Sequence, residues 1–113
     1  MNVSTAHKGG VVIMHVNEPR LTYPILSNFA SEVAERIAAG DKKILIDLAS
    51  VGYVDSATIG CLMDLYRQAS AAGGALKLSG VQKRVETMLT MTGAQNFLEV
   101  HADQATALAS FGG

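Results

Sequence analysis

Short apolar runs rich in β-branched residues alternate along this chain with longer segments whose apolar residues recur every three to four positions. The first pattern favours buried strands, and the second favours amphipathic helices. Strands that alternate with single helices usually pair in parallel through right-handed crossovers, and the helices then lie against the sheet. The sequence therefore predicts an α/β fold with a mixed, mostly parallel sheet of about four to five strands.

The boundaries of these elements follow from turn residues and helix caps. A chain of 113 residues can bury one core but not two, so we expect a single domain over 1–113. Its core is expected at about 11–111, and residues 1–10 are either an N-terminal extension or an edge strand. The predicted strands are 11–16, 43–48, 75–79 and a short last strand over 96–100, with 54–56 leading into the second helix. The predicted helices run from Thr22 or Tyr23 to about 40, and over 56–72, 81–93 and 102–111.

The balance of charges and the lengths of the apolar runs exclude several functions. Nine Lys and Arg residues stand against ten Asp and Glu residues, with the signs interspersed, so we expect no nucleic-acid partner. No apolar run approaches the ~18 residues of a membrane span, and the first ten residues lack a signal-peptide pattern. We therefore expect a cytoplasmic protein with no direct membrane insertion. The single cysteine, Cys61, is expected in or near the core.

Neither an enzyme nor a cofactor is expected. The three histidines, His7, His15 and His101, stand at no metal-ligand spacing, and His15 is expected to be a strand residue. The chain has no Gly-x-Ser-x-Gly elbow and no Gly-x-x-x-x-Gly-Lys-Ser/Thr phosphate loop. No acidic pair follows the first strand, as a phospho-aspartate receiver would require.

The segment Asp55 to Gly60 is the strongest functional candidate. Ser56 stands between a strand-like run and a helix, where the first backbone N–H groups lack partners and the helix dipole is positive. A phosphoryl group there would add about −1.5 to −2 charges beside the carboxylate of Asp55. Such a negative spot would release a partner that had bound the unmodified form.

The same segment also has a purely structural interpretation. Asp55, Ser56 or Thr58 is a suitable N-cap, a contribution of about 0.5–2 kcal/mol. Gly60 inside a helix costs about 1 kcal/mol relative to Ala, so it indicates the close approach of a neighbouring or partner backbone. Spacing alone leaves both interpretations open.

The residues from Leu45 to Gly60 resemble the central signature of STAS domains, the family of bacterial anti-sigma factor antagonists. In that family a hydrophobic strand ends in Asp-Leu, and a short turn leads to Asp-Ser-(Ser/Thr)-Gly-(Leu/Ile)-Gly at the start of a helix. A Gly-Gly-like break and another strand follow, to which Ala72 to Leu78 is similar. The resemblance extends from about Val11 to Phe111 and implies a single STAS-like domain.

The resemblance also implies a function and a set of site residues. It implies an anti-sigma factor antagonist that binds an anti-sigma factor, a GHKL-type serine kinase, while unphosphorylated. The kinase would switch the protein off by phosphorylating Ser56, and a PP2C-type phosphatase would reverse this step. The expected partner-binding residues are Thr22, Asp55, Ser56, Ala57, Thr58 and Gly60.

Three positions depart from the family pattern. Thr58 replaces a glycine and thereby reduces backbone freedom at the helix start, and Ala57 replaces Ser or Thr. Thr22 replaces the acidic residue of a Leu-Asp pair that faces the partner, and Thr58 is predicted to be a cap rather than a second acceptor. The alternative function is an accessory STAS subunit that braces the ATPase of a lipid-transport ABC system without phosphorylation.

Overall fold

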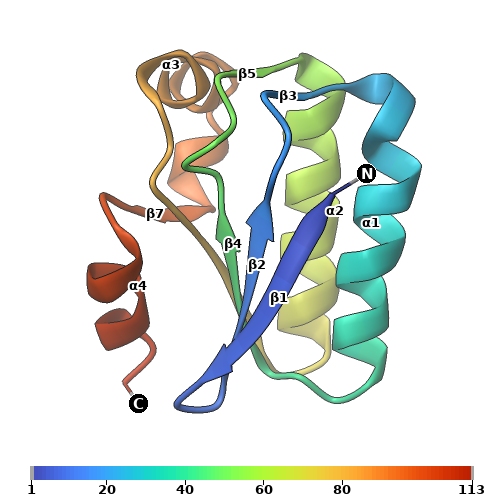
Figure 1. Ribbon diagram of the computed structural model, residues 1–113, viewed down its shortest axis with the longest axis vertical. Coiled ribbons are helices and arrows are strands. Elements are labelled where there is room, and N and C mark those ends of the chain that lie inside the picture. The colour runs from blue at the N-terminus through green and yellow to red at the C-terminus, as the bar shows by residue number, and fades with distance from the viewer. Residues whose placement is uncertain (1, 113) are drawn as a thin grey trace.

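A five-stranded sheet forms the centre of the computed structural model, which describes residues 2–112 (Figure 1). Residues 1 and 113, which the predicted domain includes, lie outside this range. The strand order is β1-β2-β4-β6-β7, with β1 antiparallel to β2 and the other neighbours parallel. The predicted α/β class and mixed sheet are confirmed. The strands are β1 (Val3–Lys8), β2 (Val11–Val16), β4 (Lys43–Asp47), β6 (Ala75–Ser79) and β7 (Glu99–His101).

The helices cover the two faces of the sheet unequally. Helices α1 and α2 lie side by side on one face, and the short α4 lies on the other (Figure 1). Gly93, the last residue of the predicted helix 81–93, ends α3 in the left-handed conformation, with φ of 77°. No helix within residues 2–112 has the length and apolarity that a membrane span requires. The helices are α1 (Tyr23–Ala38), α2 (Ser56–Ala71), α3 (Lys83–Thr92) and α4 (Gln104–Ser110), and the 3₁₀ turn η1 (Ala94–Asn96) follows α3.

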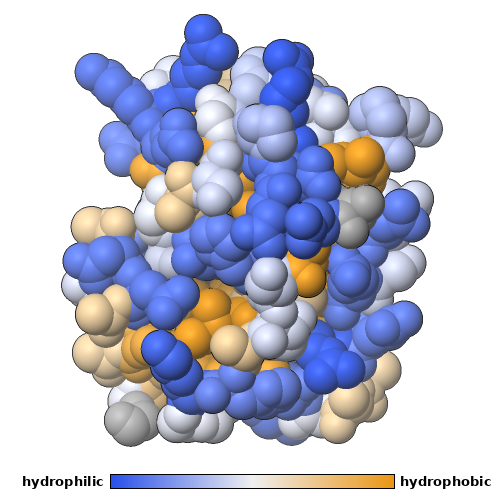
Figure 2. Space-filling view, in the orientation of Figure 1, coloured by the Kyte–Doolittle hydropathy of each residue, from blue (hydrophilic) through white to orange (hydrophobic). Residues whose placement is uncertain are grey.

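Alternate residues of the central strands face two different cores. Met14 and Ile46 pack with α1, α2 and α3 in the larger core, whereas Ile13 and Leu45 pack with Ala107 of α4 in the smaller one. Figure 2 shows apolar side chains gathered between β1 and α4, on a surface that is otherwise largely hydrophilic. Because both faces are covered, β2 and β4 are apolar over most of their length rather than alternating with polar residues.

Three details of the chain differ from the sequence-based expectation or settle an open choice. The strand β3 (Arg20–Leu21), which the sequence did not predict, pairs in parallel with β5 (Tyr53–Val54) in a separate two-stranded sheet. The strand predicted over 96–100 begins only at residue 99. The buried side chains of Ala94 and Leu98, four residues apart, instead favour the helical turn η1. Of the two possibilities for residues 1–10, the structure contains the edge strand, β1.

The side chain of Lys77 fastens α4 to the sheet. Its Nζ donates to the carbonyl O and the Oγ of Ser110, at 3.0 and 2.9 Å, and lies 4.6 Å from the centre of the Phe111 ring. The same Nζ lies 2.9 Å from Glu99 Oε2, which is also 2.5 Å from His101 Nε2. These contacts bind the last helix to β6 and β7 and so complete the smaller core.

Glu99 is expected to make part of the stability depend on pH. Hydrogen bonds from Lys77 and His101 lower its pKa from 4.5 to about 2, so the folded state holds this proton less tightly than the unfolded chain. The contribution is therefore present above about pH 4.5 and is lost as the pH falls toward 2. Glu99→Gln should flatten the dependence of the unfolding free energy on pH in that range, measured by urea unfolding at a series of pH values. Lys77→Met should act in the same direction, and wild-type slopes in both variants would contradict the pairing.

Candidate partner-binding site

The carboxylate of Asp55 holds the starts of two helices together. Asp55 is the N-cap of α2, and its Oδ1 accepts a hydrogen bond of 2.9 Å from the backbone N–H of Thr58. Its Oδ2 accepts a 2.9 Å bond from the backbone N–H of Tyr23, the first residue of α1. One side chain therefore caps its own helix and binds the beginning of its neighbour.

Thr58 completes this arrangement from inside the protein. Its side chain is fully buried, and its hydroxyl lies 2.6 Å from the carbonyl O of Leu21 in β3 and 2.7 Å from Asp55 Oδ1. The hydroxyl has one proton, which these two acceptors share. The predicted capping function of Thr58 thus belongs to Asp55, and Thr58 supplies the N–H that is capped and a link to β3. Because it is buried, Thr58 presents no side chain to a partner.

Asp55 is held in its ionised form by these hydrogen bonds. Partial burial raises the pKa of this carboxyl, but the bonds from Thr58 and Tyr23 outweigh that effect and bring the pKa below its ordinary value. The start of α2 therefore carries a permanent negative charge at neutral pH.

Ser56 and Ala57 are the first two residues of α2, and both are exposed. The two side chains lie on opposite sides of the helix start: Ser56 lines a groove between α2 and η1, and Ala57 lines a groove between α1 and α2. We refer to these as the α2–η1 groove and the α1–α2 groove. Their volumes are about 470 and 490 Å³, respectively.

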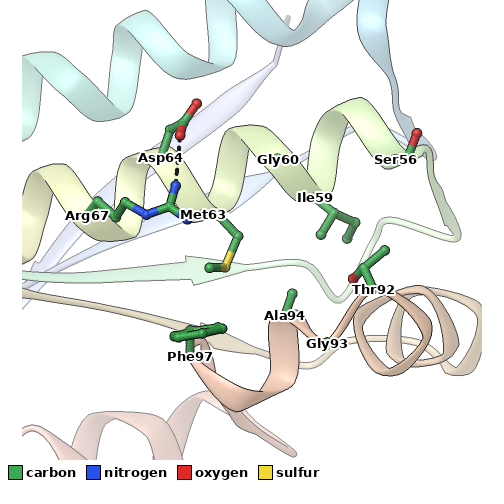
Figure 3. A pocket seen from close by; sticks show the side chains of 10 residues that line it. All are labelled: Ser56, Ile59, Gly60, Met63, Asp64, Arg67, Thr92, Gly93, Ala94 and Phe97. Carbon is green, nitrogen blue, oxygen red and sulfur yellow. Dashed lines mark hydrogen bonds and ion pairs between the residues drawn. The ribbon is translucent and has the colours of Figure 1, made fainter.

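The α2–η1 groove has an apolar floor between polar ends. Figure 3 shows the side chains of Ile59, Met63 and Phe97 directed into it, with Ser56 at one end. At the other end, Arg67 Nη1 and Asp64 Oδ1 form an ion pair of 3.1 Å. Such an arrangement suits a partner with an apolar ridge and polar flanks.

The α1–α2 groove lies on the other side of the same helix. Tyr23, which is 74% exposed, stands at its rim, and Cys61 lies in its wall. Cys61 is half-buried against the larger core, as the sequence predicted, and burial together with the nearby charge of Asp64 raises the pKa of its thiol. The thiol is therefore a packing group rather than a reactive one.

Gly60 is the lowest point of the ridge that separates the two grooves. It is exposed, it lines both grooves, and a Cβ added to it would meet nothing within 4 Å. No neighbour in the fold of residues 2–112 therefore requires a glycine at this position. The close approach of a neighbouring backbone, one of the two explanations offered by the sequence, is therefore absent.

The predicted site residues are thus brought together except for two. Asp55, Ser56, Ala57 and Gly60 share the exposed start of α2, whereas Thr58 is inside the protein. Thr22 is the backbone N-cap of α1, is half-buried and makes no side-chain capping bond. It adjoins the site only through its neighbour Tyr23, which binds Asp55.

The sequence did not indicate that two exposed aromatic side chains border the grooves, or that η1 forms a wall of one of them. Tyr23 and Phe97 are exposed to 74% and 58% and stand at the two grooves. The sequence predicted Phe97 inside a strand, and that position gave no reason to expect an exposed side chain at a groove. The available signal was that Phe97 directly follows a segment whose apolar residues have helical spacing.

Within residues 2–112 no group of three or more His, Cys, Asp or Glu side chains forms a metal site.

Replacing Gly60 by Ala is expected to stabilise the isolated protein. The added methyl group meets open space, and alanine in a helix interior is favoured over glycine by about 1 kcal/mol. Urea unfolding should show this gain as a higher midpoint with an unchanged slope. A loss of stability would show that the fold itself needs the glycine.

Comparisons with known proteins agree with this architecture. Residues 2–107 match the STAS domain family. A protein of Thermotoga neapolitana, provisionally named an anti-sigma factor antagonist and a homolog of TM1081, is 28% identical over 74 residues. That match spans 66% of this chain and 66% of the relative, just under two thirds of its length. The crystal structure of TM1081 from Thermotoga maritima, with the same provisional name, superposes with a TM-score of 0.90 at 21% identity, over 98% of this chain and 95% of that one.

Two further similarities show how widely the fold occurs. SpoIIAA of Bacillus, an anti-sigma factor antagonist solved in unphosphorylated and phosphorylated forms, gives TM-scores of 0.79 and 0.73 at 15% and 14% identity. Those alignments cover 95% and 96% of this chain and 93% and 98% of the SpoIIAA chains. The murine anion transporter Slc26a9 gives 0.80 at 18% identity, over 95% of this chain and 18% of the transporter. At these identities the structures show a shared fold alone, and the family match over residues 2–107 shows more: this chain belongs to the STAS domain family.

Proposed function

We propose that this protein is an anti-sigma factor antagonist that binds a GHKL-type serine kinase, its anti-sigma factor, through α2 and the two grooves beside it. Phosphorylation of Ser56 ends the binding. The observation that carries the proposal is the position of Ser56, exposed as the first residue of α2 and adjacent to the ionised carboxylate of Asp55. In this role the protein acts by binding its partner.

The electrostatics of the helix start support a switch. The positive end of the α2 dipole tolerates a phosphoryl group on Ser56, so the protein keeps its own fold after modification. A partner fitted to the same surface meets two neighbouring negative groups where it had met one, and this like-charge contact weakens the complex. The added phosphate therefore changes the interface rather than the fold.

The shape of α2 supports close docking on the same face. The missing side chain at Gly60 leaves a depression between the two grooves, and nothing else in residues 2–112 uses that space. The exposed aromatic rings of Tyr23 and Phe97 stand on either side of it, and aromatic residues carry much of the energy of protein interfaces. Contacts by the kinase across this depression would bring its phosphate donor near Ser56.

The cycle is completed by two enzymes that act on this chain. The kinase transfers the γ-phosphoryl group of ATP to Ser56 Oγ, and a PP2C-type phosphatase hydrolyses the phosphoserine and restores the binding form. SpoIIAA, whose fold this chain shares, has been solved in both phosphorylation states. That precedent supports the proposal for the present protein.

The deciding experiment is incubation of the protein with its cognate GHKL kinase and ATP, followed by mapping of the phosphosite by mass spectrometry. Phosphate on Ser56, and none on the Ser56→Ala variant, is the expected result. Formation of the native complex without any phosphate on Ser56 would overturn the switch. Treatment of the modified protein with a PP2C-type phosphatase should return its affinity to the starting value.

A second candidate function uses the same surface without phosphorylation. In it, the protein is an accessory subunit that braces the ATPase of a lipid-transport ABC system. The observation in its favour is Thr58, which stands at the family's glycine position and ties the start of α2 to β3. Equal binding of the partner by Ser56→Asp and Ser56→Ala variants would favour this candidate over the switch.

A further inference from the structure

A row of polar side chains crosses the carboxyl ends of the parallel strands, on the face that α4 covers. The pairing register places His15 of β2 beside Asp47 of β4, Asp47 beside Ser79 of β6, and Ser79 beside His101 of β7. In open α/β sheets, ligands bind just outside the carboxyl ends of the strands. This row lies on the opposite face of the sheet from α2, so the proposed partner site does not use it.

Three side chains at this edge stand in the order of a proton relay. Asp47 Oδ2 lies 2.9 Å from His15 Nδ1, and His15 Nε2 lies 3.1 Å from Ser50 Oγ. Ser50 follows β4 in the turn and is exposed, His15 is half-buried, and Asp47 is 8% exposed. A buried carboxylate, an imidazole and an exposed hydroxyl in this sequence form the constellation by which serine nucleophiles are activated.

The hydrogen bonds around Asp47 determine which ring nitrogen of His15 donates and which accepts. Its Oδ1 accepts a 3.0 Å bond from the backbone N–H of Ala49, and its Oδ2 accepts a 3.2 Å bond from Gln104 Nε2. An ionised carboxylate only accepts hydrogen bonds, so in that form of Asp47 the ring of His15 donates through Nδ1. In the neutral tautomer that this bond favours, Nε2 is an acceptor facing the hydroxyl of Ser50.

A second observation indicates that this edge is more than a packing surface. Ser79 is fully buried next to Asp47 in the register, and its Oγ has no hydrogen-bond partner within residues 2–112. Leaving a buried hydroxyl unpaired costs about 1–3 kcal/mol. Two buried side-chain atoms in residues 2–112 lack a partner, Glu32 Oε2 and Ser79 Oγ, and the second lies beside Asp47 in the register. A catalytic function of the surrounding groups is one reason for which folds retain such a cost.

We propose that Ser50 is an activated nucleophile for small, reactive acyl esters, with His15 as its general base and Asp47 as the residue that positions His15. In the acylation step, His15 Nε2 takes the proton of Ser50 while Ser50 Oγ forms a bond to the acyl carbon. The bond from that carbon to the leaving alkoxide or thiolate breaks, and the leaving group takes the proton from His15. The products are acyl-Ser50 and the free alcohol or thiol, with His15 neutral again.

The test uses the whole protein and p-nitrophenyl acetate as the acyl donor. Release of p-nitrophenolate is followed by absorbance, and the acetylated residue is located by peptide mass spectrometry. Ser50 is expected to be acetylated first, and Ser50→Ala to abolish this phase. His15→Ala should slow it by about 10²–10⁴-fold, the usual contribution of a general base, and added imidazole should restore part of the rate. Ser31→Ala, which removes another exposed serine, is the matched control and should leave the rate unchanged.

Two results would overturn the proposal. One is acetylation of Ser50 no faster than that of other exposed serines. The other is an undiminished rate in a His15→Ala variant whose circular dichroism and melting temperature match the wild type. For Asp47, the conservative Asp47→Asn variant should lower the rate and shift its pH profile, whereas a purely structural group would change only stability. None of these outcomes depends on whether Ser56 is phosphorylated.

Discussion

Replacement of Asp55 by Ala is expected to lower the free energy of unfolding by about 2–3 kcal/mol, an unusually large effect for a half-buried surface residue. The variant loses the cap of α2 through Thr58 and, at the same time, the bond to Tyr23 that begins α1. Loss of a single N-cap typically costs about 1 kcal/mol. The additional loss of stability in Asp55→Ala therefore measures the contribution of the bond to Tyr23, which links the two helices. Urea unfolding at neutral pH gives the value directly.

The chain contains a matched control for this measurement. Asp103 caps α4 in the same manner, with its Oδ1 accepting a 2.8 Å bond from the backbone N–H of Thr106, and it caps that helix alone. Asp103→Ala is therefore expected to lower the free energy of unfolding clearly less than Asp55→Ala does. Equal losses in the Asp55→Ala and Asp103→Ala variants would show that the bond to Tyr23 contributes nothing to stability.

Replacement of Ser56 by Asp is expected to weaken the complex with the anti-sigma kinase by about 100-fold, or about 2.8 kcal/mol, because a second carboxylate then adjoins Asp55 in the interface. The free protein should change in the opposite direction. A carboxylate at the first position of α2 interacts favourably with the helix dipole, by about 0.3–1 kcal/mol. Titration calorimetry with the purified partner measures the first effect, and urea unfolding measures the second.

Ser70→Asp is the control for a nonspecific effect of charge. Ser70 is exposed on the same helix but lies 14 positions further along, about 21 Å from Ser56 at the helical rise per residue. This variant should bind the partner as tightly as the wild type. If the Ser56→Asp and Ser70→Asp variants weakened binding equally, long-range charge rather than the contact at Ser56 would be responsible. Ser56→Ala should bind with full affinity and should not respond to ATP.

Both grooves border α2, and apart from Thr22 every site residue predicted from the sequence lies at the start of that helix. Its start could be recognised because the Asp-Ser motif and the glycines are local signals, and the same holds for the Gly-Gly break before β6. The groove walls come from α1 and from η1, which lie far from α2 in the sequence. Phe97 reaches its groove only because the chain makes a helical turn at Ala94 where a strand had been expected.

Thr58 illustrates the same limit at a single residue. In the sequence, Thr58 stands where the family pattern has a glycine, and the expected effect was reduced backbone freedom at the helix start. In the fold its hydroxyl reaches the carbonyl O of Leu21, 37 residues away, and β3 itself was not predicted. Two-residue strands have no periodicity to detect, so their pairing is visible only in three dimensions.

By itself the sequence determined the alternation of strands and helices, the α/β class and the family signature around Ser56, because hydrophobic periodicity and capping act between residues close together in the chain. Tertiary structure alone decided the strand order, the joint capping of α1 and α2 by Asp55, and the depth of the two grooves. It also placed His15 between Asp47 and Ser50, a relation that no spacing in the sequence displayed. Contacts of this kind form when parallel strands set distant residues side by side, and their register is fixed by packing of the whole core.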